Sequence, residues 1–188
     1  IAGDKVGKFK YAEDEYYSYR DHLLASVNGD FSGMKIVVDT ANGSAYRIAK
    51  DVFLALGAEV VLINDAPNGT NINVRCGSTH PEILTKVVVG YEADLGLAYD
   101  GDADRLIAVD ENGNIVDGDH IMILSAVYLK KKNELANNTL VVTVMTNIGL
   151  NVAAREHGIN LETTDVGDRY VIEAMKKGNF NLGGEQSG

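Results

Sequence analysis

The sequence has 188 residues, of which 45% are hydrophobic and 23% are charged, and these proportions are typical of a folded globular protein rather than of a disordered chain. Its 17 basic and 27 acidic residues give a net charge of −10 at pH 7, which disfavours nucleic acids and anionic membranes as partners. No apolar run reaches the roughly 18 to 20 residues that a membrane span needs, and no signal peptide opens the chain. The single cysteine, Cys76, excludes an internal disulfide and suits a reducing cytoplasm, where we expect it to be an inert packing residue.

The first half of the chain alternates helical and extended patterns. Apolar side chains recur at helical spacing in several stretches, and short apolar runs bounded by Gly or Asn predict strands between them. In chain order we expect a helix at 4–27, a buried strand and tight turn at 34–43, a helix at 44–57, a strand at 58–65, a loop at 66–81, a helix at 81–92, a strand at 93–100 and a hairpin at 105–116. Asn112 and Gly113 mark the turn of the hairpin.

The second half repeats the pattern of the first. In chain order we expect a helix at 120–132, a strand at 138–147, a helix at 148–158, a strand at 159–165, a helix at 167–178 and a strand running into a loop at 179–188. Both halves contain the order strand, Asn/Gly turn, helix, glycine, strand. The sequence therefore predicts an α/β fold of two related modules, 12–115 and 119–188, with mostly parallel mixed sheets flanked by helices.

An acidic cluster ends the apolar strand at 93–100. Asp100, Asp102 and Asp104 alternate with small residues, which let the backbone bend so that the carboxylates converge, and Arg105 follows at once. Three close carboxylates repel one another unless a cation lies between them, and their hard oxygen atoms suit Mg²⁺ or Ca²⁺. Arginine is suited to a bidentate contact with phosphate. Because ligands of parallel sheets bind at the carboxyl ends of strands, the pattern favours a Mg²⁺ site beside a phosphate.

The cluster has three other interpretations. A solvated turn with hydrogen-bonded aspartates is the simplest of them. An EF-hand calcium loop would use Glu111 as its twelfth residue but needs glycine at the sixth position, which is Arg105, so this loop type is excluded. A phosphatase with Asp100 as nucleophile remains a lesser alternative, since that family expects Thr or Val at the position of Asp104.

Two further polar turns carry candidate site residues. Glu185 and Ser187 lie in the glycine-rich stretch "GGEQSG", where a carboxylate and a hydroxyl can bind the hydroxyls of a sugar. Asp168 begins the helix at 167–178 and could cap it, while Arg169 opposes the helix dipole and indicates an anionic partner. For His80, a structural role in its loop is favoured over a catalytic one.

Taken together, eight stretches resemble the α-D-phosphohexomutase superfamily, and within it the glucosamine branch. They are, in order, "VVDTANGSAY", "LGAEV", "PNGTNIN", "CGSTHPE", "DGDADR", "VDGD", "VGDRYV" and "GGEQSG". The resemblance implies a four-domain enzyme, with domain 2 at 12–115, most of domain 3 at 119–188, and 1–11 as a linker from a missing first domain. The chain begins at Ile1 and ends in a glycine-rich turn, so we expect a fragment.

The resemblance also implies a reaction and a metal site. It implies that Asp100, Asp102 and Asp104 bind Mg²⁺ together with a phosphoserine of the missing first domain, and that Arg105 contacts the transferring phosphoryl group. The implied reaction interconverts glucosamine 6-phosphate and glucosamine 1-phosphate. Phosphoserine gives its phosphoryl group to the free hydroxyl, and the bisphosphorylated sugar then returns its other phosphoryl group to serine. The nucleophilic serine and the phosphate-binding loop of a fourth domain are not in this chain.

The two polar turns acquire roles by the same resemblance. Glu185 and Ser187 correspond to the sugar-hydroxyl loop, and Asp168 and Arg169 correspond to a second loop on the substrate side. One departure is Asp165, because many members carry lysine at this position before "VGDRYV". The implied partners are a hexosamine phosphate and the missing domains 1 and 4, and a homodimer is left open.

Other functions remain open at this point. A mannose or glucose phosphomutase of the same superfamily, a phosphatase and a non-catalytic module that binds Mg²⁺ and sugar phosphate are the alternatives. For the leading interpretation we expect a cytoplasmic isomerase of amino-sugar and cell-wall precursor synthesis. Because its nucleophile lies elsewhere, the fragment alone is expected to be inactive.

Overall fold

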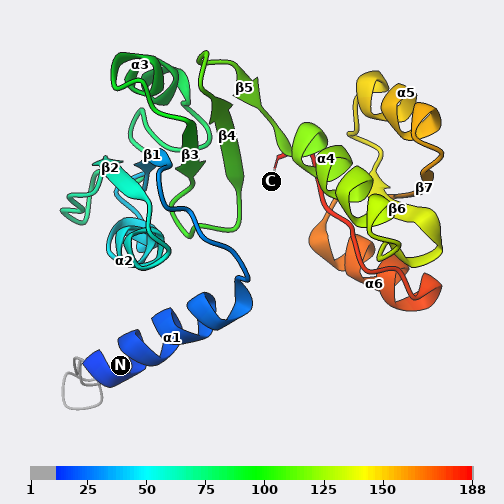
Figure 1. The fold of residues 1–188 in the computed structure, drawn as a ribbon, viewed down its shortest axis with the longest axis horizontal. Helices are drawn as coiled ribbons and strands as arrows, with labels where there is room; N and C mark the ends of the chain where they lie inside the picture. The colour runs from blue at the N-terminus through cyan, green and yellow to red at the C-terminus, as the bar shows by residue number, and fades with distance from the viewer. Residues whose placement is uncertain (1–11, 188) are drawn as a thin grey trace, which may run out of the picture.

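A computed structural model describes residues 12–187 of the chain. Two α/β modules follow one another and are connected where a short hairpin strand runs into a long helix (Figure 1). The expected fold class is therefore confirmed. The predicted linker and the first part of the helix predicted at 4–27 lie outside the described residues. Within the described part of the chain, no helix is long and apolar enough to cross a membrane.

The first module contains a five-stranded mixed sheet in the order β2-β1-β3-β4-β5. The strands are β1 (Lys35–Asp39), β2 (Glu59–Ile63), β3 (Leu95–Tyr99), β4 (Leu106–Asp110) and β5 (Ile115–Val116). Strand β1 pairs in parallel with both β2 and β3, and β3 pairs antiparallel with β4. Strands β4 and β5 form the hairpin predicted at 105–116. The chain thus leaves the inner strand β1 toward one edge and returns on the other side of β1, which creates a switch point at the carboxyl ends of β1 and β3.

Helices cover both faces of this sheet. Ile36 and Val38 of β1 pack with Ala49 of α2 on one face, and Val37 packs with Leu84 of α3 on the other. The helices are α2 (Ile48–Ala55) and α3 (Glu82–Gly90). Because successive side chains of a strand point to opposite faces, this apolar strand is buried on both sides. Its carboxyl end is therefore fixed rigidly where the candidate site begins.

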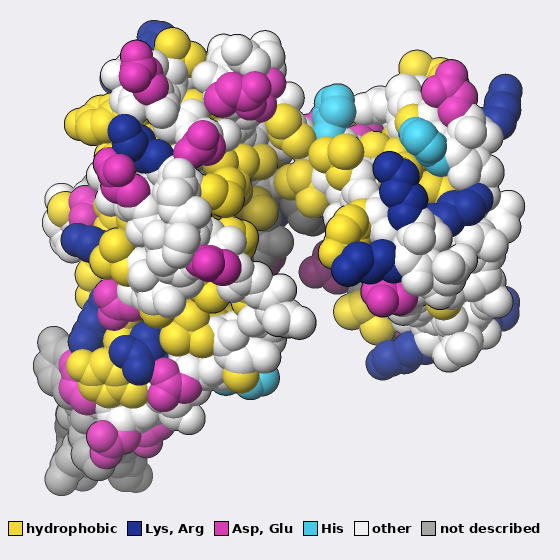
Figure 2. Space-filling model, in the orientation of Figure 1, with side chains coloured by type: hydrophobic (Ala, Val, Ile, Leu, Met, Phe, Trp, Pro, Cys, Tyr) yellow, Lys and Arg dark blue, Asp and Glu magenta, His cyan; other side chains and the backbone are white. Residues whose placement is uncertain are grey.

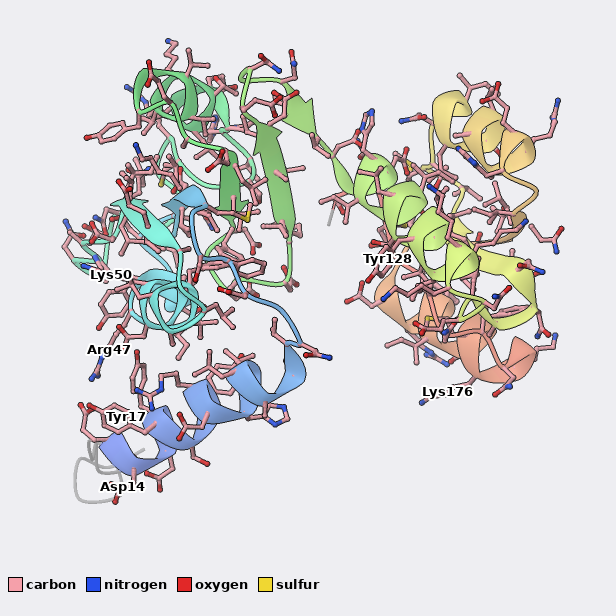
Figure 3. All side chains as sticks on the ribbon, viewed as in Figure 1. Asp14, Tyr17, Arg47, Lys50, Tyr128 and Lys176 are labelled. Carbon is pink, nitrogen blue, oxygen red and sulfur yellow. The ribbon has the colours of Figure 1, made fainter. Side chains whose placement is uncertain are left out.

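The first helix, α1 (Glu13–Ser26), contacts α2 and is attached to it by polar interactions. The Tyr16 hydroxyl donates a hydrogen bond to Asp51 at 2.5 Å, and Arg47 pairs with Glu13 at 2.9 Å. Arg47 extends from the start of α2 toward α1 (Figure 3) and stacks over the Tyr16 ring at 4.0 Å. Burial and the Asp51 carboxylate raise the pKa of Tyr16 to about 12.

The second module is built on a pair of parallel strands. Its elements are α4 (Gly118–Lys131), β6 (Thr139–Thr143), α5 (Ile148–Glu156), β7 (Asn160–Thr164) and α6 (Asp168–Gly178). Leu140 and Val142 of β6 pack with residues of α4 and α5 on one face. The intervening Val141 faces Val171 of α6, with Gly183 packed between them. The two faces again follow the period of a β-strand.

Three predicted elements differ from the structure. The helix predicted at 44–57 is a 3₁₀ turn at Ser44–Tyr46 followed by α2. The strand predicted at 138–147 ends at Thr143, because the chain turns and Thr146 donates a backbone hydrogen bond to Thr143. Of the strand predicted to run into a loop at 179–188, only one bridge is present, between Gly183 and Val141, since paired glycines have low strand propensity.

The core of the second module provides a direct test of this packing. Leu140→Ala removes a fully buried side chain of β6 and should lower the free energy of unfolding by about 2–5 kcal/mol. Leu124→Ala removes the same atoms from a position on α4 that is 64% exposed, and should change it by less than about 0.5 kcal/mol. Urea unfolding followed by circular dichroism measures both, and equal effects would contradict the assignment of Leu140 to the core.

Candidate metal and substrate site

The acidic cluster forms a tight loop between β3 and β4, at the switch point of the first sheet. The loop closes on itself, because the backbone N–H of Ala103 donates to Asp100 O at 3.0 Å and that of Asp100 donates to Arg105 O at 3.3 Å. Ala103 adopts a left-handed conformation with φ 59°, which reverses the chain. Carboxylate oxygens of Asp100, Asp102 and Asp104 consequently all lie within 4.8 Å of one another. The convergence inferred from the small intervening residues is therefore present.

Arg105 is the cation that stabilises this loop. Its Nε and Nη2 atoms both lie 2.9 Å from Asp100 Oδ2, and its backbone N–H donates to Asp100 Oδ1 at 3.2 Å. Although burial opposes ionisation, these hydrogen bonds and the guanidinium charge hold the pKa of Asp100 below its usual value. By contrast, partial desolvation and the charges of Asp100 and Asp102 raise the pKa of Asp104. With three carboxylates beside one guanidinium, the loop contains more negative charge than Arg105 alone balances.

The donor set fits a hard divalent cation. Asp100 is 1% exposed, whereas Asp102 and Asp104 face solvent. Carboxylate oxygens each have two lone pairs, so the Asp100 oxygens can bind a metal while accepting from Arg105. Oxygen ligands of this kind suit Mg²⁺ or Ca²⁺ better than zinc. The flanking elements are strands, not helices, which also excludes the EF-hand arrangement.

Two neighbouring segments support the acidic loop through its backbone. Ser44 N–H donates to Gly101 O, and Ser78 N–H donates to Tyr99 O, both at 2.9 Å. A Cβ atom on Gly43 would lie 2.4 Å from Gly101 O, so only glycine permits this approach. From the sequence, "DTANGSA" was predicted only to form a turn between a strand and a helix. Its role in supporting the acidic loop was missed, although Gly43 could have indicated a close approach of another backbone segment.

In the second module, the stretch "GGEQSG" is fixed between the N-termini of two helices. Glu185 Oε1 accepts a hydrogen bond from Gly167 N–H at 2.7 Å, at the start of α6. Gly118 N–H, at the start of α4, donates to Gln186 O at 3.1 Å. The Gln186 side chain also donates to Asp117 Oδ2 at 3.2 Å. The structure thus brings together the two loops that the sequence singled out separately, and it adds Gln186 and Asp117.

Two carboxylates at the start of α4, the half-buried Asp117 and the buried Asp119, organise this region. Asp117 caps the helix by accepting a hydrogen bond from His120 N–H at 3.1 Å. Although burial opposes ionisation of Asp117, hydrogen bonds from His120 and Gln186 hold its pKa below the usual value. Asp119 accepts from Asn147 N–H at 2.8 Å. These bonds join the turn after β6 to the same end of the module, where the carboxyl ends of its strands lie.

The remaining predicted residues lie at the surface. Asp168 is the first residue of α6, but the helix has no side-chain cap, so the capping role considered for Asp168 is wrong. Arg169 pairs with Glu173 one turn along α6 at 2.7 Å. Ser187 and His80 are exposed.

In Figure 2 the two modules are joined at one side and separated by an open gap beyond that joint.

Cys76 is fully buried. Burial raises the pKa of its thiol, which disfavours the reactive thiolate. This agrees with the packing role expected for Cys76.

Family models match nearly the whole described chain. The model described as phosphoglucomutase/phosphomannomutase, alpha/beta/alpha domain II matches residues 15–113, and the corresponding domain III model matches residues 117–188. The phosphoglucosamine mutase of Fusobacterium nucleatum is 64% identical over 188 residues, which are 100% of this chain and 42% of that protein. The phosphoglucosamine mutase of Clostridioides difficile is 61% identical over 186 residues, which are 99% of this chain and 42% of that protein.

Solved structures share the same fold. A phosphoglucomutase/phosphomannomutase family protein from Burkholderia thailandensis has a TM-score of 0.79 and 28% identity, and the match covers 96% of this chain and 39% of that chain. An N-acetylglucosamine-phosphate mutase of the α-D-phosphohexomutase superfamily has a TM-score of 0.67 and 22% identity, over 95% of this chain and 43% of that one. The chain spans about two fifths of the length of the relatives that it matches. It belongs to the phosphoglucomutase/phosphomannomutase family of phosphohexomutases, with matches to domains II and III of that family.

Proposed function

We propose that this chain is part of a Mg²⁺-dependent phosphoglucosamine mutase, which interconverts glucosamine 6-phosphate and glucosamine 1-phosphate. The observation that carries the proposal is the convergence of three carboxylates within 4.8 Å beside Arg105, at the switch point of a family fold. The relatives at 64% and 61% identity are named phosphoglucosamine mutases, which supports this sugar over glucose or mannose. The enzyme would act in the cytoplasm, in amino-sugar and cell-wall precursor synthesis.

The chemistry proposed for the first module is charge neutralisation during phosphoryl transfer. A Mg²⁺ ion held by Asp100, Asp102 and Asp104 would offset charge on the phosphoryl oxygens. Arg105 is 44% exposed, so its guanidinium can contact a phosphoryl oxygen from the solvent side while remaining paired with Asp100. Phosphoryl transfer depends mainly on such positioning and electrostatic stabilisation.

Two transfers complete the proposed reaction. A phosphoserine outside this chain gives its phosphoryl group to the free hydroxyl of the sugar phosphate, and the hydroxyl proton is released as the new P–O bond forms. The bisphosphorylated sugar then turns over, and its other phosphoryl group returns to the serine oxygen. No phosphoryl group is gained or lost in the cycle. The remaining domains of the polypeptide, which would supply the serine and a phosphate-binding loop, are therefore the necessary partners.

Sugar recognition is proposed for the loop of the second module. Glu185 is positioned by Gly167 N–H through one carboxylate oxygen, which leaves the other oxygen available for a sugar hydroxyl. Ser187 is exposed on the same loop. Asp168 and Arg169 lie immediately after Gly167, so the contact between Glu185 and Gly167 would bring both proposed substrate loops to the same sugar.

A phosphatase that uses Asp100 as nucleophile is disfavoured by the geometry. Both oxygens of this carboxylate accept hydrogen bonds from Arg105, and the residue is 1% exposed. A nucleophile needs an oxygen that can reach the phosphorus atom of a substrate. In Asp100, the available lone pairs are better suited to a buried metal ligand.

The metal site can be tested in the complete polypeptide. Asp102→Asn and Asp104→Asn should each weaken Mg²⁺ binding by about tenfold or more, because each removes a charged oxygen ligand. Isothermal titration calorimetry measures the affinity, and a coupled assay measures formation of glucosamine 1-phosphate. Asp14→Asn, on the exposed surface of α1, is the matched control and should change neither quantity. Unchanged affinity in both cluster variants would contradict the proposed site.

The sugar loop gives a separate prediction. Glu185→Gln keeps an oxygen for Gly167 N–H but removes the charge that would strengthen a bond to a sugar hydroxyl, and such bonds contribute about 1.5–3 kcal/mol. We expect the KM for glucosamine 6-phosphate to rise by about tenfold or more at unchanged Mg²⁺ affinity. Glu162→Gln, an exposed change on β7, serves as the control. A wild-type KM in Glu185→Gln would exclude Glu185 from sugar binding.

The isolated chain distinguishes the mutase from its main rival. Because the proposed nucleophile lies outside residues 1–188, this chain with Mg²⁺ should neither isomerise nor hydrolyse glucosamine 6-phosphate. Release of inorganic phosphate, followed with a colorimetric assay, tests this directly. Phosphate release that is lost in Asp100→Asn would instead support the phosphatase.

A further inference from the structure

We infer that Asp39, at the carboxyl end of β1, is a positioning residue that sets the geometry of the acidic loop and thereby its affinity for Mg²⁺. The inference rests on the proposed metal site. Asp39 does not belong to the group of carboxylates that converge on one point. Its effect would pass through the backbone segments that flank Asp100.

Asp39 is a fully buried carboxylate whose hydrogen-bond donors are all uncharged. Its Oδ1 atom accepts from Ala41 N–H at 2.9 Å. Its Oδ2 atom accepts from Gly77 N–H at 2.9 Å and from the Asn64 side chain at 3.0 Å. The residue is 0% exposed. A charge buried in this way is costly unless hydrogen bonds compensate for it, so these three bonds are strongly maintained.

The two backbone donors belong to the segments that support the acidic loop. Gly77 is followed by Ser78, whose N–H donates to Tyr99 O at 2.9 Å. Ala41 begins the turn that leads to Ser44, whose N–H donates to Gly101 O at 2.9 Å. One carboxylate thus holds both segments that bind the backbone on either side of Asp100.

The packing around Gly77 leaves little freedom in this arrangement. Gly77 has φ 72°, and a Cβ atom there would lie 2.4 Å from Tyr99 O and 2.6 Å from the Ala41 side chain. The backbone of Gly77 is therefore pressed between the acidic loop and the turn after β1. A displacement of Gly77 would be transmitted to Tyr99 and hence to Asp100.

The chemistry of the three donors explains why this position needs aspartate. An ionised carboxylate only accepts hydrogen bonds, whereas an asparagine amide presents two donors beside a single acceptor oxygen. In Asp39→Asn, the amide group would face at least one N–H donor, and the supporting segments would separate. Changes in groups that orient metal ligands typically reduce metal affinity by about 10- to 100-fold.

The test measures Mg²⁺ affinity in the complete polypeptide by isothermal titration calorimetry. We expect Asp39→Asn to weaken Mg²⁺ binding by about 10- to 100-fold, although all three cluster aspartates remain. Asn64→Gly is the matched control, because it removes one donor to Asp39 but leaves those of Ala41 and Gly77. Glycine also accepts the φ of 52° at this position, so Mg²⁺ affinity should stay within about twofold of wild type.

A second control separates positioning from loss of stability. Val37→Ala creates a cavity in the same strand, facing α3, and should lower the melting temperature without weakening Mg²⁺ binding. Gly77→Ala displaces one of the two supporting segments without altering the buried charge of Asp39, and it should weaken Mg²⁺ binding as Asp39→Asn does. If Asp39→Asn does not fold, Gly77→Ala tests the positioning role in its place. Wild-type affinity in folded Asp39→Asn or in Gly77→Ala, or equal loss in Val37→Ala, would overturn the inference.

Hydrogen exchange without metal distinguishes this inference from the proposed function. Asp39→Asn should accelerate amide exchange at Ala103 and Arg105 in the metal-free protein, and Asn64→Gly should not. If the wild-type protein bound no Mg²⁺, the proposed function would fail whatever the exchange showed. If exchange at the acidic loop were unchanged in Asp39→Asn, the positioning role would fail even with an intact metal site.

Discussion

The ion pair between Asp100 and Arg105 is the interaction on which the candidate site depends. Asp100 is almost fully buried, and a buried charge without a partner costs about several kcal/mol. Arg105 lies only five residues after Asp100 and compensates for this buried charge with hydrogen bonds from its side chain and its backbone N–H. The pair therefore closes the loop across its base, and Asp102 and Asp104 are left at the exposed tip.

Close backbone contacts extend this order from the loop to the sheet. Gly43 and Gly77 allow neighbouring segments to approach Gly101 and Tyr99 at distances that a side chain would prevent. Those segments in turn converge on the carboxylate of Asp39 at the end of β1. Because β1 is buried on both faces, the rigidity of the core reaches the acidic loop through a few short hydrogen bonds.

Most of the fold, and only part of the site, followed from the sequence. The spacing of apolar residues predicted the strands and helices, because a side that is buried must be apolar. The acidic cluster could be recognised because it directly follows an apolar strand. The strand predicted at the start of 179–188 was wrong, because only Gly183 pairs with β6, where it packs against Val141 and Val171. The contact of Glu185 with Gly167 could not be predicted, because it joins two loops through a fold whose register the sequence does not specify.

The charge of the molecule links the metal to the proposed substrate. A chain with net charge −10 repels a sugar phosphate, and three clustered carboxylates strengthen that repulsion locally. Arg105 cannot reverse the local field alone, because its charge is already shared with Asp100. A divalent cation on the same carboxylates would turn the most negative part of the loop into the part that attracts phosphate. In the proposed function, metal dependence and the phosphoryl contact of Arg105 are therefore consequences of the same loop.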